Sequence, residues 1–93
     1  LISMEEHDYH FNQEKKDQIM KVLMEDKSLP ELPYKIEKVS YLDGSKVYFE
    51  DGGWVIARFS GTEPLLRIFC EMKNPADAKN VVEIYERFLG LNQ

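Results

Sequence analysis

The chain has 93 residues, a length that allows one domain with a modest hydrophobic core. Hydrophobic residues make up 43% of the sequence and charged residues 31%, which favours a packed core over disorder, and no apolar run approaches the ~20 residues that span a bilayer. Seventeen acidic and twelve basic residues give a net charge of −5, which counts against general binding of nucleic acids.

Residues 1–11 are polar and mixed, and we expect them to form a connector with room for one brief strand. No signal-peptide pattern opens the chain. Because its first residue is Leu1 and not Met, we expect it to be a piece of a longer protein. Asn12 is a suitable N-cap for a helix that runs to about Lys27 with apolar side chains at helical spacing. Two prolines within residues 28–33 then end the helical pattern.

From Lys35 the period of the apolar residues changes to two, which is typical of strands. Four such runs occupy residues 35–41, 46–49, 54–59 and 65–72. Asn74 and Pro75 then indicate the N-cap and first turn of a second helix, which Gly90 can end. The order helix, four strands, helix predicts an α+β domain in which both helices cover one face of a four-stranded antiparallel sheet.

The alternation also predicts how the strands pair, because a slip of one residue would turn every side chain to the wrong face. Loops of three residues at 43–45 and 51–53, and of four residues at 61–64, give one face that is apolar throughout. The predicted pairs are Val39–Phe49, Tyr41–Val47, Phe49–Val55, Val55–Cys70, Ala57–Ile68 and Phe59–Leu66. The side chains predicted to face the helices are Val39, Val47, Phe49, Val55, Ala57, Phe59, Leu66 and Ile68.

This register places Arg58 and Arg67 directly opposite each other on the other face, at the mouth of the last loop. Like charges in this position are destabilising, and an anion between the two guanidinium groups would remove the conflict. The loop adds the hydroxyls of Ser60 and Thr62, and Gly61 allows a ligand to approach the backbone closely. The arrangement therefore indicates a phosphate-binding loop.

Plainer interpretations of the same residues stay open. Ser60 and Glu63 match the spacing of a capping box, and Arg58 could form a surface ion pair with Glu63 or Glu71. The apolar side chains beside the arginines could be partly buried or could form a patch that another domain covers; they are Trp54, Ile56 and Phe69.

The remaining chemically active side chains suggest no second site. The single cysteine, Cys70, faces the helices and is expected in the core, and its being alone fits a reducing, cytoplasmic location. His7 and His10 lie in the polar segment and are expected at the surface, so we predict no metal site in this chain.

The run from Arg58 to Glu71, with Ser60-Gly61-Thr62-Glu63-Pro64 at its centre, resembles the phosphate-binding signature of the C-terminal domain of α-D-phosphohexomutases. These are the phosphoglucomutase and phosphomannomutase enzymes, including phosphoglucosamine mutase. The Asp-Gly-Gly-Trp hairpin and the start of the last helix also resemble that domain, so the likeness covers nearly the whole chain. It implies a fold similar to the TATA-binding protein for residues 12–93, with residues 1–11 as the connector from the preceding domain.

The resemblance also implies an activity for the full-length protein, namely an intramolecular phosphotransferase that interconverts hexose 1-phosphate and hexose 6-phosphate. In that family a phosphoserine, Mg²⁺ and a hexose 1,6-bisphosphate intermediate carry the reaction, and three further domains of the same chain complete the cleft. No motif for the phosphoserine, the metal loop or the sugar-reading loop occurs here, so we expect the isolated chain to be inactive and to bind no cofactor, and the hexose stays open.

By the same resemblance, the C-terminal domain binds the phosphate that is not reacting and closes the cleft. The residues that match its phosphate-binding positions are Arg58, Ser60, Gly61, Thr62 and Arg67, while Glu63 and Pro64 match positions that shape the loop. A hexose phosphate is then the expected partner, without nucleic acid or membrane. The alternative is a free-standing module that binds an anion or a protein without catalysis.

Overall fold

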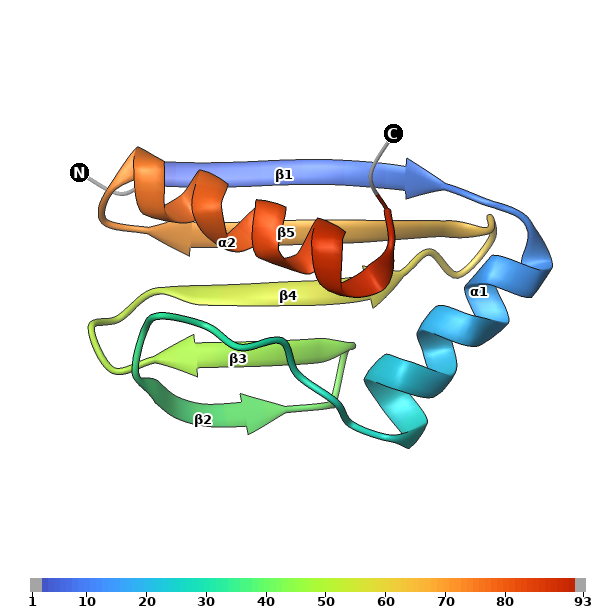
Figure 1. Cartoon of the computed structure of the whole chain (residues 1–93), viewed down its shortest axis with the longest axis horizontal. Helices are drawn as coiled ribbons and strands as arrows, with labels where there is room; N and C mark the ends of the chain where they lie inside the picture. The colour runs from blue at the N-terminus through green and yellow to red at the C-terminus, as the bar shows by residue number, and fades with distance from the viewer. Residues whose placement is uncertain (1–2, 92–93) are drawn as a thin grey trace.

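Five antiparallel strands and two helices make up the computed structural model, which describes residues 3–91 (Figure 1). The strands are β1 (Ser3–His10), β2 (Ile36–Ser40), β3 (Ser45–Phe49), β4 (Trp54–Phe59) and β5 (Leu65–Met72). The helices are α1 (Gln13–Met20), which continues into a π-helical stretch (Lys21–Glu25), and α2 (Pro75–Leu89). The strand order is β1-β5-β4-β3-β2, so the first strand of the chain lies beside the last.

The expected number of four strands is wrong, because residues placed in the connector form strand β1. All eight residues of β1 pair with β5, from Ser3 opposite Met72 to His10 opposite Leu65. Only Tyr9 of this strand is buried, so β1 lacks the alternation of apolar residues that marks a half-buried strand. Charged side chains on an edge strand also discourage pairing with other molecules. The α+β class itself is confirmed.

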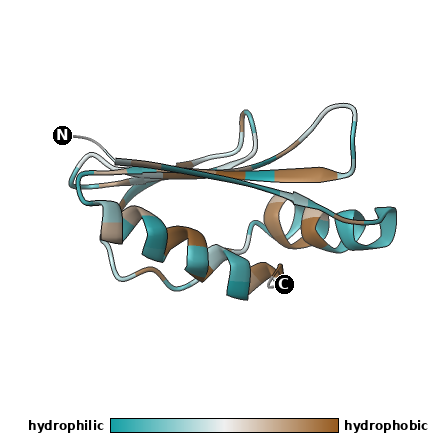
Figure 2. Cartoon of the chain, turned by 90° about the horizontal axis from the view of Figure 1, so that it is seen from above, coloured by the Kyte–Doolittle hydropathy of each residue, from teal (hydrophilic) through white to brown (hydrophobic). Residues whose placement is uncertain are grey.

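Both helices lie on the same face of the sheet, and the core fills the space between them (Figure 2). All eight side chains predicted to face the helices belong to this core or pack against it, Val39 and Phe59 being only partly buried. From the helices, the core takes Ile19, Leu23, Ala78, Val81, Val82, Tyr85 and Leu89. The buried Cys70 is among the core residues, as predicted. Within residues 3–91, no helix is long and apolar enough to cross a membrane.

The ends of α2 follow the sequence signals closely. The Asn74 side chain accepts a hydrogen bond of 2.8 Å from the Ala76 amide, and Pro75 occupies the first turn. At the other end Gly90 adopts φ +66°, a left-handed conformation that glycine adopts readily. Asn12 caps α1 in the same way, its side chain accepting from the Lys15 amide at 2.9 Å.

We expect Asn74→Ala to lower the free energy of unfolding by about 1 kcal/mol, because the cap at the start of α2 is lost. For a domain of this size the melting temperature should fall by about 4–8 °C. Asn74→Ser keeps an oxygen that can accept the Ala76 amide and should unfold close to the wild-type temperature. Equal losses in both variants would show that the cap is not the stabilising element.

Two of the three predicted hairpin registers are wrong by two residues. Val39 and Val55 both pair with Val47, whereas the predicted partner of each was Phe49. In the first hairpin Tyr41 lies outside β2, and its hydroxyl donates to the Lys27 carbonyl at 3.3 Å. In the second hairpin the Phe49 amide instead bonds to the carbonyl of residue 53, at 2.8 Å. A shift of two residues preserves the face of each side chain, so the core is unaffected.

Candidate phosphate-binding site

The hairpin of β4 and β5 carries the candidate site, and its predicted register is confirmed. Arg58 lies opposite Arg67, and Phe59 lies opposite Leu66. The face away from the helices, which we call the open face, carries Trp54, Ile56, Arg58, Arg67, Phe69 and Glu71. Figure 2 shows two loops rising from it, which by their places in Figure 1 are the β2–β3 and β4–β5 connections. The second of these is the predicted phosphate loop.

Hydrogen bonds within the loop hold its backbone around the Ser60 side chain. Ser60 Oγ accepts from the Thr62 amide at 3.2 Å and from the Glu63 amide at 3.3 Å. The Glu63 bond is the one that a capping box would form, yet no helix follows, because Leu65 begins β5 directly. An anion that used the Thr62 amide would therefore have to displace the Ser60 hydroxyl.

A hollow of about 160 Å³ lies beside this loop. Its lining residues are Arg58, Phe59, Ser60, Gly61, Leu65 and Arg67. Small-molecule pockets usually measure roughly 300–1,000 Å³, so this hollow suits one charged group, such as a phosphate, better than a whole ligand. A methyl group on Gly61 would meet no atom within 4 Å, so this part of the loop is open to an approaching group.

The loop-shaping residues lie outside the hollow. The Pro64 carbonyl accepts a hydrogen bond of 3.2 Å from the Phe11 amide, and this bond ties the loop to the chain after β1. The Glu63 carbonyl accepts from the Leu65 amide at 2.8 Å. Thr62 does not line the hollow, although its hydroxyl lies 3.4 Å from Ser60 Oγ. Four of the five predicted phosphate-binding residues therefore line the hollow, and Thr62 lies next to Ser60 outside it.

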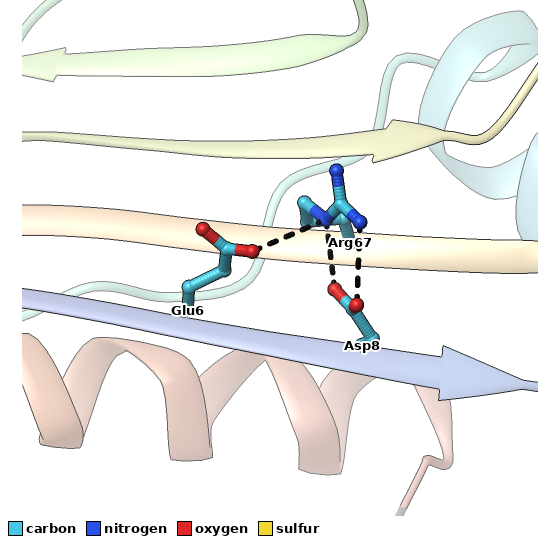
Figure 3. A network of polar contacts seen from close by, with 3 residues as sticks. All are labelled: Glu6, Asp8 and Arg67. Atoms are coloured by element: carbon cyan, nitrogen blue, oxygen red, sulfur yellow. Dashed lines mark hydrogen bonds and ion pairs between the residues drawn. The ribbon is translucent and has the colours of Figure 1, made fainter.

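The two arginines differ in their surroundings. Arg67 donates to Asp8 through Nε at 2.8 Å and through Nη2 at 3.3 Å, and its Nε lies 3.4 Å from Glu6 (Figure 3). The hydrogen bond and the charge of Arg67 lower the pKa of the Asp8 carboxyl below its ordinary value, and the same bond raises the pKa of Arg67. Arg58 forms no ion pair with another residue between 3 and 91. It is the free cation of the pair.

A wider hollow of about 390 Å³ covers the open face and is also lined by both arginines. In it Trp54 stacks on Phe69 with 5.3 Å between ring centroids, and Lys46 Nζ lies 4.3 Å from the Trp54 ring centroid. The Trp54 indole donates to Glu71 at 3.2 Å, and the alternative in which Arg58 pairs with Glu63 or Glu71 is not formed among residues 3–91. The apolar patch is therefore partly covered by polar neighbours of the same sheet.

The sequence model of the phosphoglucomutase/phosphomannomutase C-terminal domain matches residues 12–87. The chain belongs to this family. A phosphoglucomutase/phosphomannomutase of Thermococcus kodakarensis is 47% identical over 47 residues, which are 50% of this chain and 10% of the relative. The phosphoglucosamine mutase of Methanocaldococcus jannaschii is 36% identical over 75 residues, which are 75% of this chain and 14% of the relative. The chain thus corresponds to a small part of the length of these mutases.

Two acidic residues of the site in this mutase domain were missed by sequence reasoning. Glu6 and Asp8 reach the open face only because β1 pairs with β5, and residues 1–11 were read as a connector. Their spacing of two residues was the one available signal, since it puts both carboxylates on the same face of a strand. His7 lies between them and turns to the other side, where it bonds to Glu5 at 2.9 Å.

Proposed function

We propose that this mutase domain binds the non-reacting phosphate of a hexose phosphate and closes the cleft of the full-length enzyme around it. The enzyme would interconvert hexose 1-phosphate and hexose 6-phosphate through a phosphoserine and a hexose 1,6-bisphosphate. Membership in the family supports the activity, and the geometry of the β4–β5 loop supports the role of the domain. A fold like the TATA-binding protein and a cytoplasmic location stay predictions.

The observation that carries the proposal is the free guanidinium of Arg58 at a hollow the size of one charged group. Arg58 and the loop that carries Ser60 line this hollow together, and Arg58 has no carboxylate partner among residues 3–91. In a chain with five excess negative charges, an unpaired arginine beside a hydroxyl loop is well suited to an anion. The hydroxyl of Ser60 can donate to a phosphate oxygen once its bonds to the loop amides open.

The other parts of the reaction would come from the remaining domains. Among residues 3–91, no three His, Cys, Asp or Glu side chains form a group that could hold a metal ion, so the Mg²⁺ of the family would be held by another part of the full-length enzyme. Phosphoryl transfer needs a donor, charge stabilisation and an aligned acceptor, of which this chain supplies only a positioning charge. We therefore infer that the isolated chain does not interconvert hexose phosphates.

Titration of the ¹⁵N-labelled chain with inorganic phosphate and with glucose 6-phosphate tests the proposed site. The amide signals of Ser60, Gly61 and Thr62 should move first, because the phosphate enters the hollow beside them. Binding should be weak, since the site is exposed and solvent screens its charges. Chloride at the same ionic strength is the control. Larger shifts in α2 than in the loop, or equal shifts with chloride, would contradict the proposal.

A further inference from the structure

Three residues on neighbouring strands form one row across the open face. Asp8 on β1 lies opposite Arg67 on β5, and Arg67 lies opposite Arg58 on β4. Beyond Arg58 the row continues with Gly44, which has no side chain. Gly44 lies so close that a Cβ added to it would stand 2.9 Å from the Arg58 Cβ. The two arginines are thus bounded by a carboxylate on one side and by a glycine on the other.

Asp8 takes up one edge of the Arg67 guanidinium. It accepts from both Nε and Nη2, the two-point geometry in which arginine binds carboxylates and phosphates alike. Figure 3 shows the remaining terminal nitrogen of Arg67 pointing away from Asp8, toward β4. A phosphate that sought a two-point contact with Arg67 along the same edge would meet the Asp8 carboxylate there.

We propose that Asp8 is a positioning residue of the phosphate site, which occupies the Nε–Nη2 edge of Arg67 and leaves Arg58 as the main cationic ligand. This inference rests on the proposed phosphate-binding function. It makes Asp8 a counter-ion built into the site, so that the opposed arginines are tolerated without ligand. The anion then meets one unpaired positive charge rather than two, which lowers its affinity for the site.

Glu6 is the natural comparison for Asp8, because it lies on the same strand and the same face. It meets Arg67 in a single approach of 3.4 Å to Nε, without a second bond. The Glu6 and Asp8 side chains are similarly exposed, at 46% and 39%. Removing either charge therefore changes the general field at the site similarly, whereas only the removal of Asp8 frees the guanidinium edge.

The test compares phosphate dissociation constants of the whole 93-residue chain and its variants, measured from the Ser60–Thr62 amide shifts. Asp8→Asn should tighten binding of inorganic phosphate by roughly three- to tenfold at low salt, because Arg67 becomes available. Glu6→Gln should tighten it by less than about twofold. In an Arg67→Gln background, Asp8→Asn should also give less than about twofold, since no guanidinium is left to release.

The Arg67 Nε–H signal provides a second readout that does not depend on affinity. It should stay in place while phosphate is added to the wild-type chain, and it should move in Asp8→Asn. Weaker or unchanged phosphate binding in Asp8→Asn, or a wild-type Nε–H signal that moves with phosphate, would overturn the role of Asp8. If phosphate moves no loop amide in any variant, the proposed function fails and this inference falls with it.

Discussion

Replacing Arg58 with alanine should lower kcat/KM of a mutase that carries this domain by about 10- to 150-fold. The substitution removes charge-assisted hydrogen bonds to a phosphate dianion, which are worth roughly 1.5–3 kcal/mol. Each 1.36 kcal/mol lost from transition-state binding costs about a factor of ten in rate. Arg67 should not compensate, because its guanidinium is bound to Asp8. The fold should be unaffected, since Arg58 is exposed on the open face.

Arg87→Ala is the matched control, because it also removes an exposed arginine, in this case from α2 on the far side of the sheet. Its kcat/KM should stay close to that of the wild type. Arg58→Lys, which keeps the charge but not the planar fork, should fall between the two. In the isolated chain, Arg58→Ala should also abolish the phosphate-induced shifts of the loop amides. An unchanged efficiency in Arg58→Ala would mean that the β4–β5 loop is only a hairpin.

Replacing Gly44 with alanine should destabilise the domain by about 2–5 kcal/mol and lower its melting temperature by at least about 8 °C. Gly44 has a φ of +144°, which side-chain-bearing residues rarely adopt. A Cβ there would also lie 2.7 Å from the Ala57 carbonyl oxygen, which belongs to the backbone of β4 and cannot turn away. Conformational strain and a clash therefore act together.

Two other glycines separate these causes. Gly52 has a φ of +103° but open space around it, so Gly52→Ala should show the conformational cost alone, of about 1–2 kcal/mol. Gly61 has open space and no positive φ, so Gly61→Ala should change the stability by less than about 1 kcal/mol. Thermal unfolding of the three variants should rank Gly44 as the most sensitive. A Gly44 variant as stable as the Gly61 variant would contradict the close approach of this loop to β4.

The faces of the strands could be predicted from the sequence, but two of their registers could not. Alternation with a period of two decides which side chains are buried, and it is equally satisfied when a strand slides by two residues. The contacts that differ from the prediction lie in the loops, where the Tyr41 hydroxyl bonds to a distant carbonyl and the Phe49 amide bonds to the carbonyl of residue 53. Of the three predicted hairpins, only β4–β5, with its four-residue loop, has the predicted residue pairs.

The part of the candidate site that comes from neighbouring residues in the sequence could be predicted. Arg58, Ser60 and Gly61 come from one hairpin, and the alternation of β4 with the turn residues places them correctly. Asp8 comes from strand β1, which is far away in the sequence and carries charged side chains on both of its faces. Nothing in such a pattern reveals a partner strand, so the state of Arg67 could be read only from the structure.

The position of β1 at the edge of the sheet has a consequence for the order in which the chain folds. Hairpins between successive strands close short loops, whereas Asp8 and Arg67 are 59 residues apart, a closure that costs more entropy. We therefore expect β1 to dock late, after β5 has joined the other strands. Fraying should run in reverse, with β1 leaving first, so that a domain that has lost only this strand would expose a second free guanidinium at the loop.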